Sequence, residues 1–100
     1  MSAIAELTIF PLDKGESVSS YVAEAVSIIR ASGLDHEIGP MGTCFEGEWD
    51  EVMGVVKECM DAMNNECNRV YMVLKVDYRK GLDNRMKGKL ESIKKLMGSD

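Results

Sequence analysis

Carboxylates are the side chains with the clearest chemical potential in this sequence. Glu6 lies in an alternating apolar stretch, and Glu46 lies in PMGTCFEGEWDE, residues 40–51, where four acids fall within six positions. The two could meet if their strands join one sheet, and paired carboxylates can serve as general acid and base. Because nothing in the sequence supplies a metal set or an activated nucleophile beside them, binding of a cationic or neutral molecule is favoured over catalysis.

Histidine and cysteine, the other usual carriers of chemistry, are scarce. His36 is the only histidine, so the sequence argues against Cys/His zinc sites and Ser-His-Asp catalysis. We expect His36 to lie at the surface. Cys44, Cys59 and Cys67 are an odd set without CxxC spacing. We expect them to be small buried hydrophobes in a reducing compartment, the cytoplasm.

The composition of the whole chain limits the class of protein. One hundred residues, 45% of them hydrophobic and 29% charged, suit a single globular domain spanning residues 1–100. The net charge of −5 argues against a nucleic-acid partner. No apolar run approaches the ~20 residues that cross a bilayer, and the first ten residues lack the basic segment of a signal peptide. We therefore expect neither nucleic acid nor membrane as a partner.

The first half of the chain predicts three strands and a helix. AIAELTIFPL alternates up to Pro11, as a strand with two different faces does. A helix follows, with Ser17 as its predicted N-cap and Ser32 and Gly33 at its end. DHEIGP and MGTCFEG predict two strands paired as a hairpin. The apolar stripe of the helix consists of Val18, Val22, Ala25 and Ile29.

The second half completes the fold. A second helix begins near Glu48, with Trp49 beneath it, and its acidic first turn suits the helix dipole. RVYMVLKVD predicts the last strand, and a final helix runs from about Leu82 to Met97. The order is βαββαβ with an additional C-terminal helix. This order predicts an α+β, ferredoxin-like fold, an antiparallel sheet with two helices on one face.

The sheet face away from those two helices is predicted to be partly apolar. An exposed apolar face of this kind usually marks an interaction site. Two interpretations remain open: the final helix covers it, or another subunit does and a cavity forms between the two copies. The residues on this face are Ile4, Glu6, Thr8, Phe10, Tyr71, Val73 and Lys75.

A family resemblance runs through nearly the whole chain. Its most specific motifs are SSYV at the first helix, PMGTCFEGEWDE at the third strand and KVDYRKG after the fourth. These motifs resemble the small thiamine-binding proteins of the MTH1187/YkoF type. The resemblance implies a ferredoxin-like subunit, homodimers or homotetramers, and binding of thiamine or its pyrimidine part. It implies no established catalytic reaction and no required cofactor. The alternatives are a regulatory or assembly module that uses the open sheet face, and a minor enzyme of cofactor metabolism.

The resemblance gives a ligand against which the residue types can be tested. A thiazolium cation suits a carboxylate or an aromatic face, and an aminopyrimidine suits hydroxyls and exposed backbone. The candidate ligand-binding residues are Glu6, Thr8, Ser19, Ser20, Tyr21, Met41, Gly42, Thr43, Glu46, Tyr71 and Lys75.

Some of these assignments have competing interpretations. Ser19 and Ser20 could instead satisfy the free amides at the start of their helix, and Tyr21 could instead belong to the core. Strand alternation places Glu46 on the side of Gly42, and Thr43 on the other side. The two sets cannot line one cavity unless the strand bulges or ends there, so the side that faces the ligand is left open.

Overall fold

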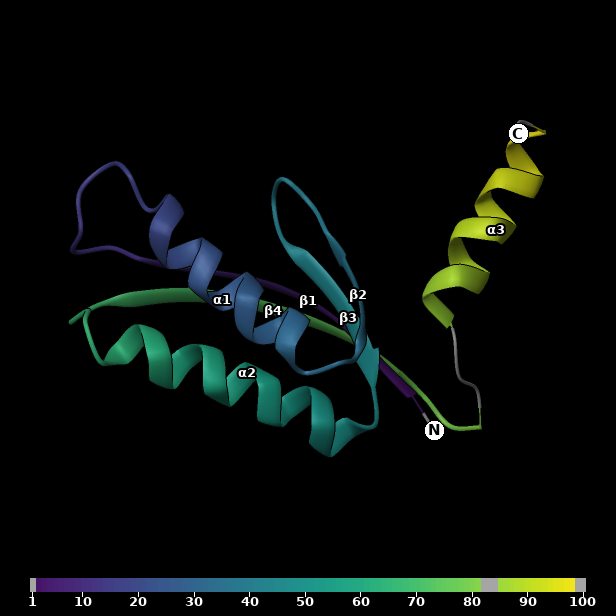
Figure 1. Cartoon of the computed structure of the whole chain (residues 1–100). Helices are drawn as coiled ribbons and strands as arrows, with labels where there is room; N and C mark the ends of the chain where they lie inside the picture. The colour runs from purple at the N-terminus through teal and green to yellow at the C-terminus, as the bar shows by residue number, and fades with distance from the viewer. Residues whose placement is uncertain (1, 82–84, 99–100) are drawn as a thin grey trace.

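The computed structural model describes residues 2–81 and 85–98, and its elements follow the predicted order (Figure 1). The four strands form one antiparallel sheet in the order β2-β3-β1-β4, and α1 and α2 lie together on one face of it. The predicted ferredoxin-like α+β fold is confirmed. The strands are β1 (Ser2–Pro11), β2 (Asp35–Ile38), β3 (Thr43–Gly47) and β4 (Val70–Arg79), and the helices are α1 (Ser19–Ala31), α2 (Trp49–Asn64) and α3 (Arg85–Met97).

Strand β1 organises the core because it is the inner strand between β3 and β4. Ala5 lies opposite Phe45 on one side and Val76 on the other, and Leu7 lies opposite Leu74. Residues directly opposite one another share a face, so this set points toward the helices. Full burial of a large apolar side chain such as Phe45 contributes roughly 1.5–3 kcal/mol. The buried members from β1 are Ala3, Ala5, Leu7 and Ile9.

The helix starts differ from one another. At α1 the N-cap position is Val18, whose carbonyl accepts the first helical bond from Val22, so the predicted Ser17 cap is wrong. Ser17 precedes that position by one residue, where its hydroxyl does not reach the free amides. At α2 the predicted start near Glu48 is confirmed: Glu48 is the N-cap residue, and it forms a reciprocal capping box with Glu51.

Several smaller predictions can also be compared with the structure. Cys59 and Cys67 are buried and Cys44 is half-buried, all as free thiols. His36 is half-buried rather than on the open surface, with Nδ1 3.0 Å from a backbone carbonyl. Trp49 is exposed and meets Tyr78 edge to face with ring centroids 6.0 Å apart, so it does not pack beneath α2 as predicted.

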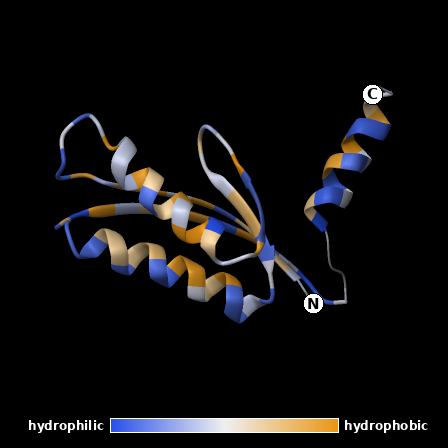
Figure 2. Cartoon of the chain, in the orientation of Figure 1, coloured by the Kyte–Doolittle hydropathy of each residue, from blue (hydrophilic) through white to orange (hydrophobic). Residues whose placement is uncertain are grey.

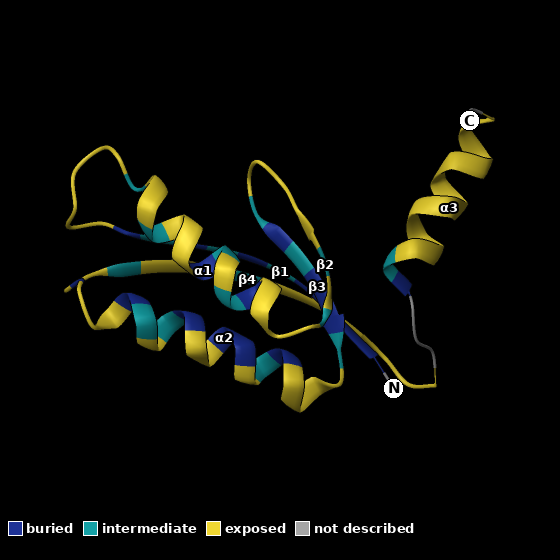
Figure 3. Cartoon of the chain, viewed as in Figure 1, coloured by how far each residue is buried: buried dark blue, intermediate teal, exposed yellow. Residues whose placement is uncertain are grey.

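Helix α3 covers only the end of the open sheet face of its own chain where Ser2 and Glu46 lie. Figure 1 shows it standing away from the other helices, and Figure 3 shows it exposed except at its base. Arg85 is buried there and Met86 is half-buried, whereas residues 87–98 are exposed. Leu82, where this helix was expected to begin, lies outside the described residues.

Candidate functional site

A groove opens between α1, the end of β1 and the hairpin loop 39–42, and we call it the hairpin groove. Strand β3 pairs with β1 only as far as Leu7, whereas β1 continues to Pro11 with β4 alone. The edge of β1 from Thr8 to Phe10 therefore has no strand partner on that side among the described strands. The resulting space has a volume of about 310 Å³, within the range of small-molecule sites.

The loop that closes the groove depends on glycines. The Gly39 amide donates to the carbonyl of Gly42 at 2.9 Å, and a Cβ on Gly39 would lie 2.7 Å from that oxygen. The Thr8 hydroxyl donates to the carbonyl of Met41 at 2.7 Å, which ties the loop to β1. A Cβ on Gly42 would lie 2.9 Å from the Thr8 hydroxyl oxygen, so this approach requires glycine. The Met41 side chain itself is exposed.

The groove is apolar with a few polar groups. Its helix wall includes Val22, Val26 and Ile29, and none of the described residues that line it is charged. Thr43 is buried on its inner side, because its pairing with Leu7 turns its side chain toward the helices. The strand alternation predicted from sequence is therefore correct, and Thr43 belongs to the groove. Such a site suits a flat, uncharged heteroaromatic ring.

The open sheet face holds a different set of candidate residues. Glu6 Oε1 lies 2.8 Å from Lys75 Nζ, directly opposite in register, and the Cys44 sulfur lies 3.9 Å from Glu6 Oε2. The hydrogen bond and the charge of Lys75 hold the pKa of Glu6 below its ordinary value. Tyr71 packs on Phe10 with ring centroids 5.5 Å apart. Of the candidate ligand-binding residues, Thr8 lies on this face and also lines the hairpin groove.

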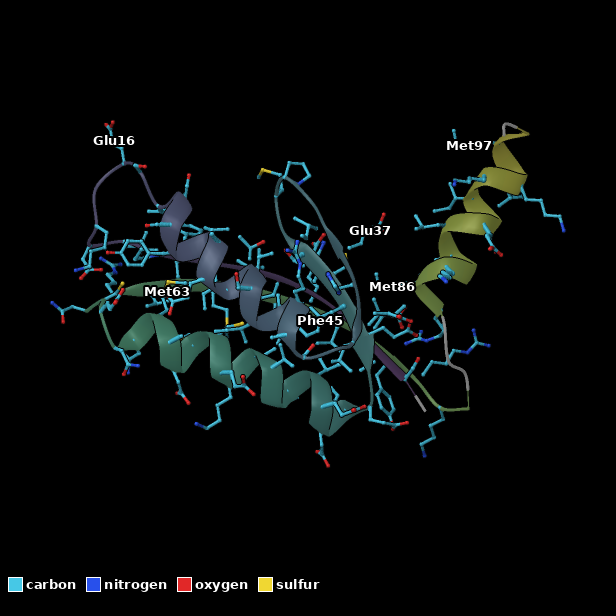
Figure 4. The ribbon with its side chains drawn as sticks, viewed as in Figure 1. Glu16, Glu37, Phe45, Met63, Met86 and Met97 are labelled. Atoms are coloured by element: carbon cyan, nitrogen blue, oxygen red, sulfur yellow. The ribbon has the colours of Figure 1, made fainter. Side chains whose placement is uncertain are left out.

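Glu46 lies apart from the hairpin groove. Its carboxylate accepts hydrogen bonds from the backbone amides of Arg85 and Met86 at 2.8 and 3.3 Å. The Arg85 guanidinium in turn donates to the Ser2 hydroxyl at 2.8 Å and pairs with Asp77 at 3.1 Å. Figure 4 shows Met86 at the base of α3 and Met97 at its far end. These contacts hold the base of α3 on the sheet.

The predicted serines do not line the groove. Ser19 and Ser20 are exposed in the first turn of α1, and Tyr21 is half-buried against the core. The neighbouring Val18 and Val22 line the groove instead. The sequence pattern assigns these valines to the core stripe of α1, because it does not show where along β1 the pairing with β3 ends.

A family model described as thiamine-binding protein matches residues 5–94. The chain belongs to the thiamine-binding protein family. Among curated relatives, a UPF0045 protein of Methanocaldococcus jannaschii is 40% identical over 93 residues, which cover 93% of each chain. A UPF0045 protein of Methanothermobacter thermautotrophicus is 42% identical, covering 90% of this chain and 94% of that protein. The resemblance stated from the motifs is therefore confirmed.

Solved structures agree with the family assignment. The crystal structure of the M. jannaschii protein superposes with a TM-score of 0.85 at 39% identity, over 92% of this chain and 95% of that one. A Thermotoga maritima protein proposed to act in thiamine biosynthesis or salvage superposes with a TM-score of 0.78 over 91% of this chain and 99% of that one. Its identity is 24%, so this second likeness shows the fold alone.

Two kinds of feature are missing from the part of the chain that the structure describes. Among residues 2–81 and 85–98, no three His, Cys, Asp or Glu side chains gather in a way that could hold a metal ion. None of the helices described there is long and apolar enough to cross a membrane.

Proposed function

We propose that this chain binds thiamine, or its hydroxymethylpyrimidine part, without catalysing a reaction, and that the hairpin groove receives the pyrimidine ring. One observation carries the proposal: an uncharged groove of about 310 Å³ lies beside an unpaired strand edge in a member of the thiamine-binding family. The proposal requires no cofactor.

The polar groups of the groove match an aminopyrimidine. That ring presents a hydrogen-bond donor next to acceptors along one edge, and unpaired backbone carbonyls and amides can form hydrogen bonds with both. The β1 edge from Thr8 to Phe10 offers such groups, and the Thr43 hydroxyl can donate or accept. The apolar walls from α1 would pack on the faces of the ring and exclude water.

The open sheet face supplies what the cationic thiazolium needs. Gly42 stands between the groove and Glu6, and a Cβ there would lie only 3.2 Å from Glu6 Cγ. A ligand that leaves the groove over Gly42 therefore reaches a carboxylate, with the Phe10–Tyr71 pair further along the same face. Lys75 already neutralises part of the Glu6 charge, so we expect Glu6 to contribute modestly.

Self-association is part of the same proposal. The open face exposes apolar groups that a second copy would cover, giving homodimers or homotetramers with the ligand near the interface. The three free thiols suit the reducing cytoplasm as the site of action. The same apolar face also supports an alternative, a module that assembles with a different protein.

Calorimetric titration with thiamine, thiamine phosphate and hydroxymethylpyrimidine tests the proposal. Thr43→Val keeps the shape but removes the hydroxyl, and we expect about tenfold weaker binding of both unphosphorylated ligands. Thr43→Ser keeps the hydroxyl and is the matched control. Glu6→Gln should weaken thiamine binding while leaving hydroxymethylpyrimidine binding unchanged. Absence of binding at millimolar ligand, or equal affinity in Thr43→Val and wild type, would refute the proposed site.

A further inference from the structure

Helix α3 presents an apolar stripe to solvent. Leu90 is 45% exposed, Ile93 54% and Met97 70%, and their spacing places them on one side of the helix. Figure 2 shows apolar and polar residues alternating along this helix, as an amphipathic helix requires. Leu90 borders a small hollow beside β2 and Ile93 borders one beside β4, and both side chains nevertheless stay about half exposed within the described chain.

The helix needs a partner for that stripe. An isolated helix shorter than about 12–15 residues is marginal in water, because nucleation is costly and most helix stability comes from packing. Arg85–Met97 has 13 residues, and Gly88 in its interior costs about 1 kcal/mol relative to alanine. The hydrogen bonds and ion pairs that join it to the described sheet all lie within residues 85–89.

The open sheet face offers a matching apolar surface that the helix of the same chain does not reach. Phe10 and Tyr71 lie opposite each other at one end of β1 and β4, whereas Ser2 and Asp77 hold α3 near the other end. From Ser2 to Phe10, strand β1 spans about 26 Å. Helix α3 is about 20 Å long and points away from the sheet. Tyr71 and Val73 therefore remain 50% and 42% exposed.

Charge favours a second copy of this chain as the partner. Helix α3 carries five basic residues and one acid, so the remainder of this chain of net charge −5 carries −9. Asp77 pairs with Arg85 and Lys89 of its own helix. On the open face, Asp35 and Glu37 of β2 are exposed carboxylates. The other lysines of α3 are Lys87, Lys94 and Lys95.

We propose that α3 of one copy packs on the open sheet face of a second copy, and that the exchange is reciprocal. A two-fold axis across that face brings the helix of each copy to the Phe10–Tyr71 end of the other, as an isologous interface requires. The stripe covers the aromatic pair and Val73, and the lysines approach the acidic body. The inference rests on the self-association in the proposed function and not on the ligand.

Two adjacent substitutions test the interface. Ile93→Asp places a charge in the stripe, and Ser92→Asp places the same charge outside it on the neighbouring position. Light scattering at micromolar protein should give an oligomer for wild type and Ser92→Asp, and about 100-fold weaker association for Ile93→Asp. Val73→Asp should act in the same way from the sheet side. Ile93 is half exposed, so the monomer fold does not depend on it.

Mixing isotope-labelled with unlabelled protein identifies the contact directly. Filtered NMR spectra should show intermolecular contacts between the methyl groups of Ile93 and Val73. A monomeric wild type, an oligomer unaffected by Ile93→Asp, or an interface without these contacts would overturn the exchange. Thiamine titration of the same samples separates the two proposals. If the wild-type protein forms the oligomer but does not bind thiamine, only the proposed binding site is wrong. If the wild-type protein is a monomer and still binds thiamine, only the proposed exchange of α3 is wrong.

Discussion

Glu46 caps a helix that begins 39 residues later in the chain: its Oε2 accepts a hydrogen bond of 2.8 Å from the backbone amide of Arg85. The first amides of a helix have no partner within the helix, and negative charge beside them interacts favourably with the helix dipole. Here the acceptor comes from strand β3, far away in the sequence. A sheet residue therefore holds the first described turn of α3.

Glu46→Ala is expected to release α3 while leaving the sheet folded. Loss of a side-chain cap at a helix N-terminus costs about 0.5–2 kcal/mol, or about 2- to 30-fold in the opening equilibrium. Native-state hydrogen exchange of the amides of residues 89–97 should accelerate by that factor, and exchange in β1 should not. Glu16→Ala removes an exposed carboxylate from the loop before α1, far from α3 (Figure 4), and is the control. Identical rates in Glu46→Ala and wild type would contradict the capping role.

Asp77 makes the attachment of α3 sensitive to acid. Hydrogen bonds from Lys89 and Arg85 hold the pKa of Asp77 below its ordinary value. Because the pKa is lowered in the folded state, this contribution is fully present above the ordinary value of about 4 and is lost as the pH falls through the lowered value. Lys89→Met should raise the pKa of Asp77 and move the loss of α3 helicity to higher pH. An NMR titration of the Asp77 carboxyl that is unchanged in Lys89→Met would disprove this account.

Strand alternation was sufficient to predict most of the fold and the two faces of the sheet. Residues of β1 and β4 fall on the predicted sides, and Glu6 meets Lys75 because both alternate in phase. The same rule placed Glu46 away from Thr43. These features depend on local periodicity, which a sequence shows directly.

The hairpin groove and the course of α3 could not be predicted in this way. The groove exists because β3 stops pairing at Leu7, and that limit depends on register between segments far apart in sequence. The position of α3 depends on Glu46 and Asp77 meeting Arg85, again through contacts between distant segments. Periodicity predicted the stripe of this helix but could not show which surface it meets.

Gly42→Ala is expected to damage the ligand site without unfolding the protein. The new Cβ would lie 2.9 Å from the Thr8 hydroxyl oxygen, which must move and lose its bond to the carbonyl of Met41. Loss of one such bond is worth about 1 kcal/mol, so thiamine affinity should fall about fivefold. Gly54→Ala is the control, because Gly54 is exposed on α2 and a Cβ added there would have no neighbouring atom within 4 Å. It should stabilise the helix by about 0.5–1 kcal/mol and leave affinity unchanged.

Cys59 is expected to report on separation of the two packed helices. Its thiol lies on α2 and donates to the carbonyl of Ala25 on α1 at 3.6 Å, and burial raises the pKa of Cys59 to about 11. A raised folded pKa means that this contribution is fully present below the unfolded value of about 8.5 and is lost as the pH rises through about 11. At pH 8, iodoacetamide should therefore modify Cys59 only when the helices separate. Mass spectrometry across a urea series should show its alkylation following global unfolding, with half-buried Cys44 modified earlier as the internal comparison. Rapid modification of Cys59 in the native protein would show that α1 and α2 open locally.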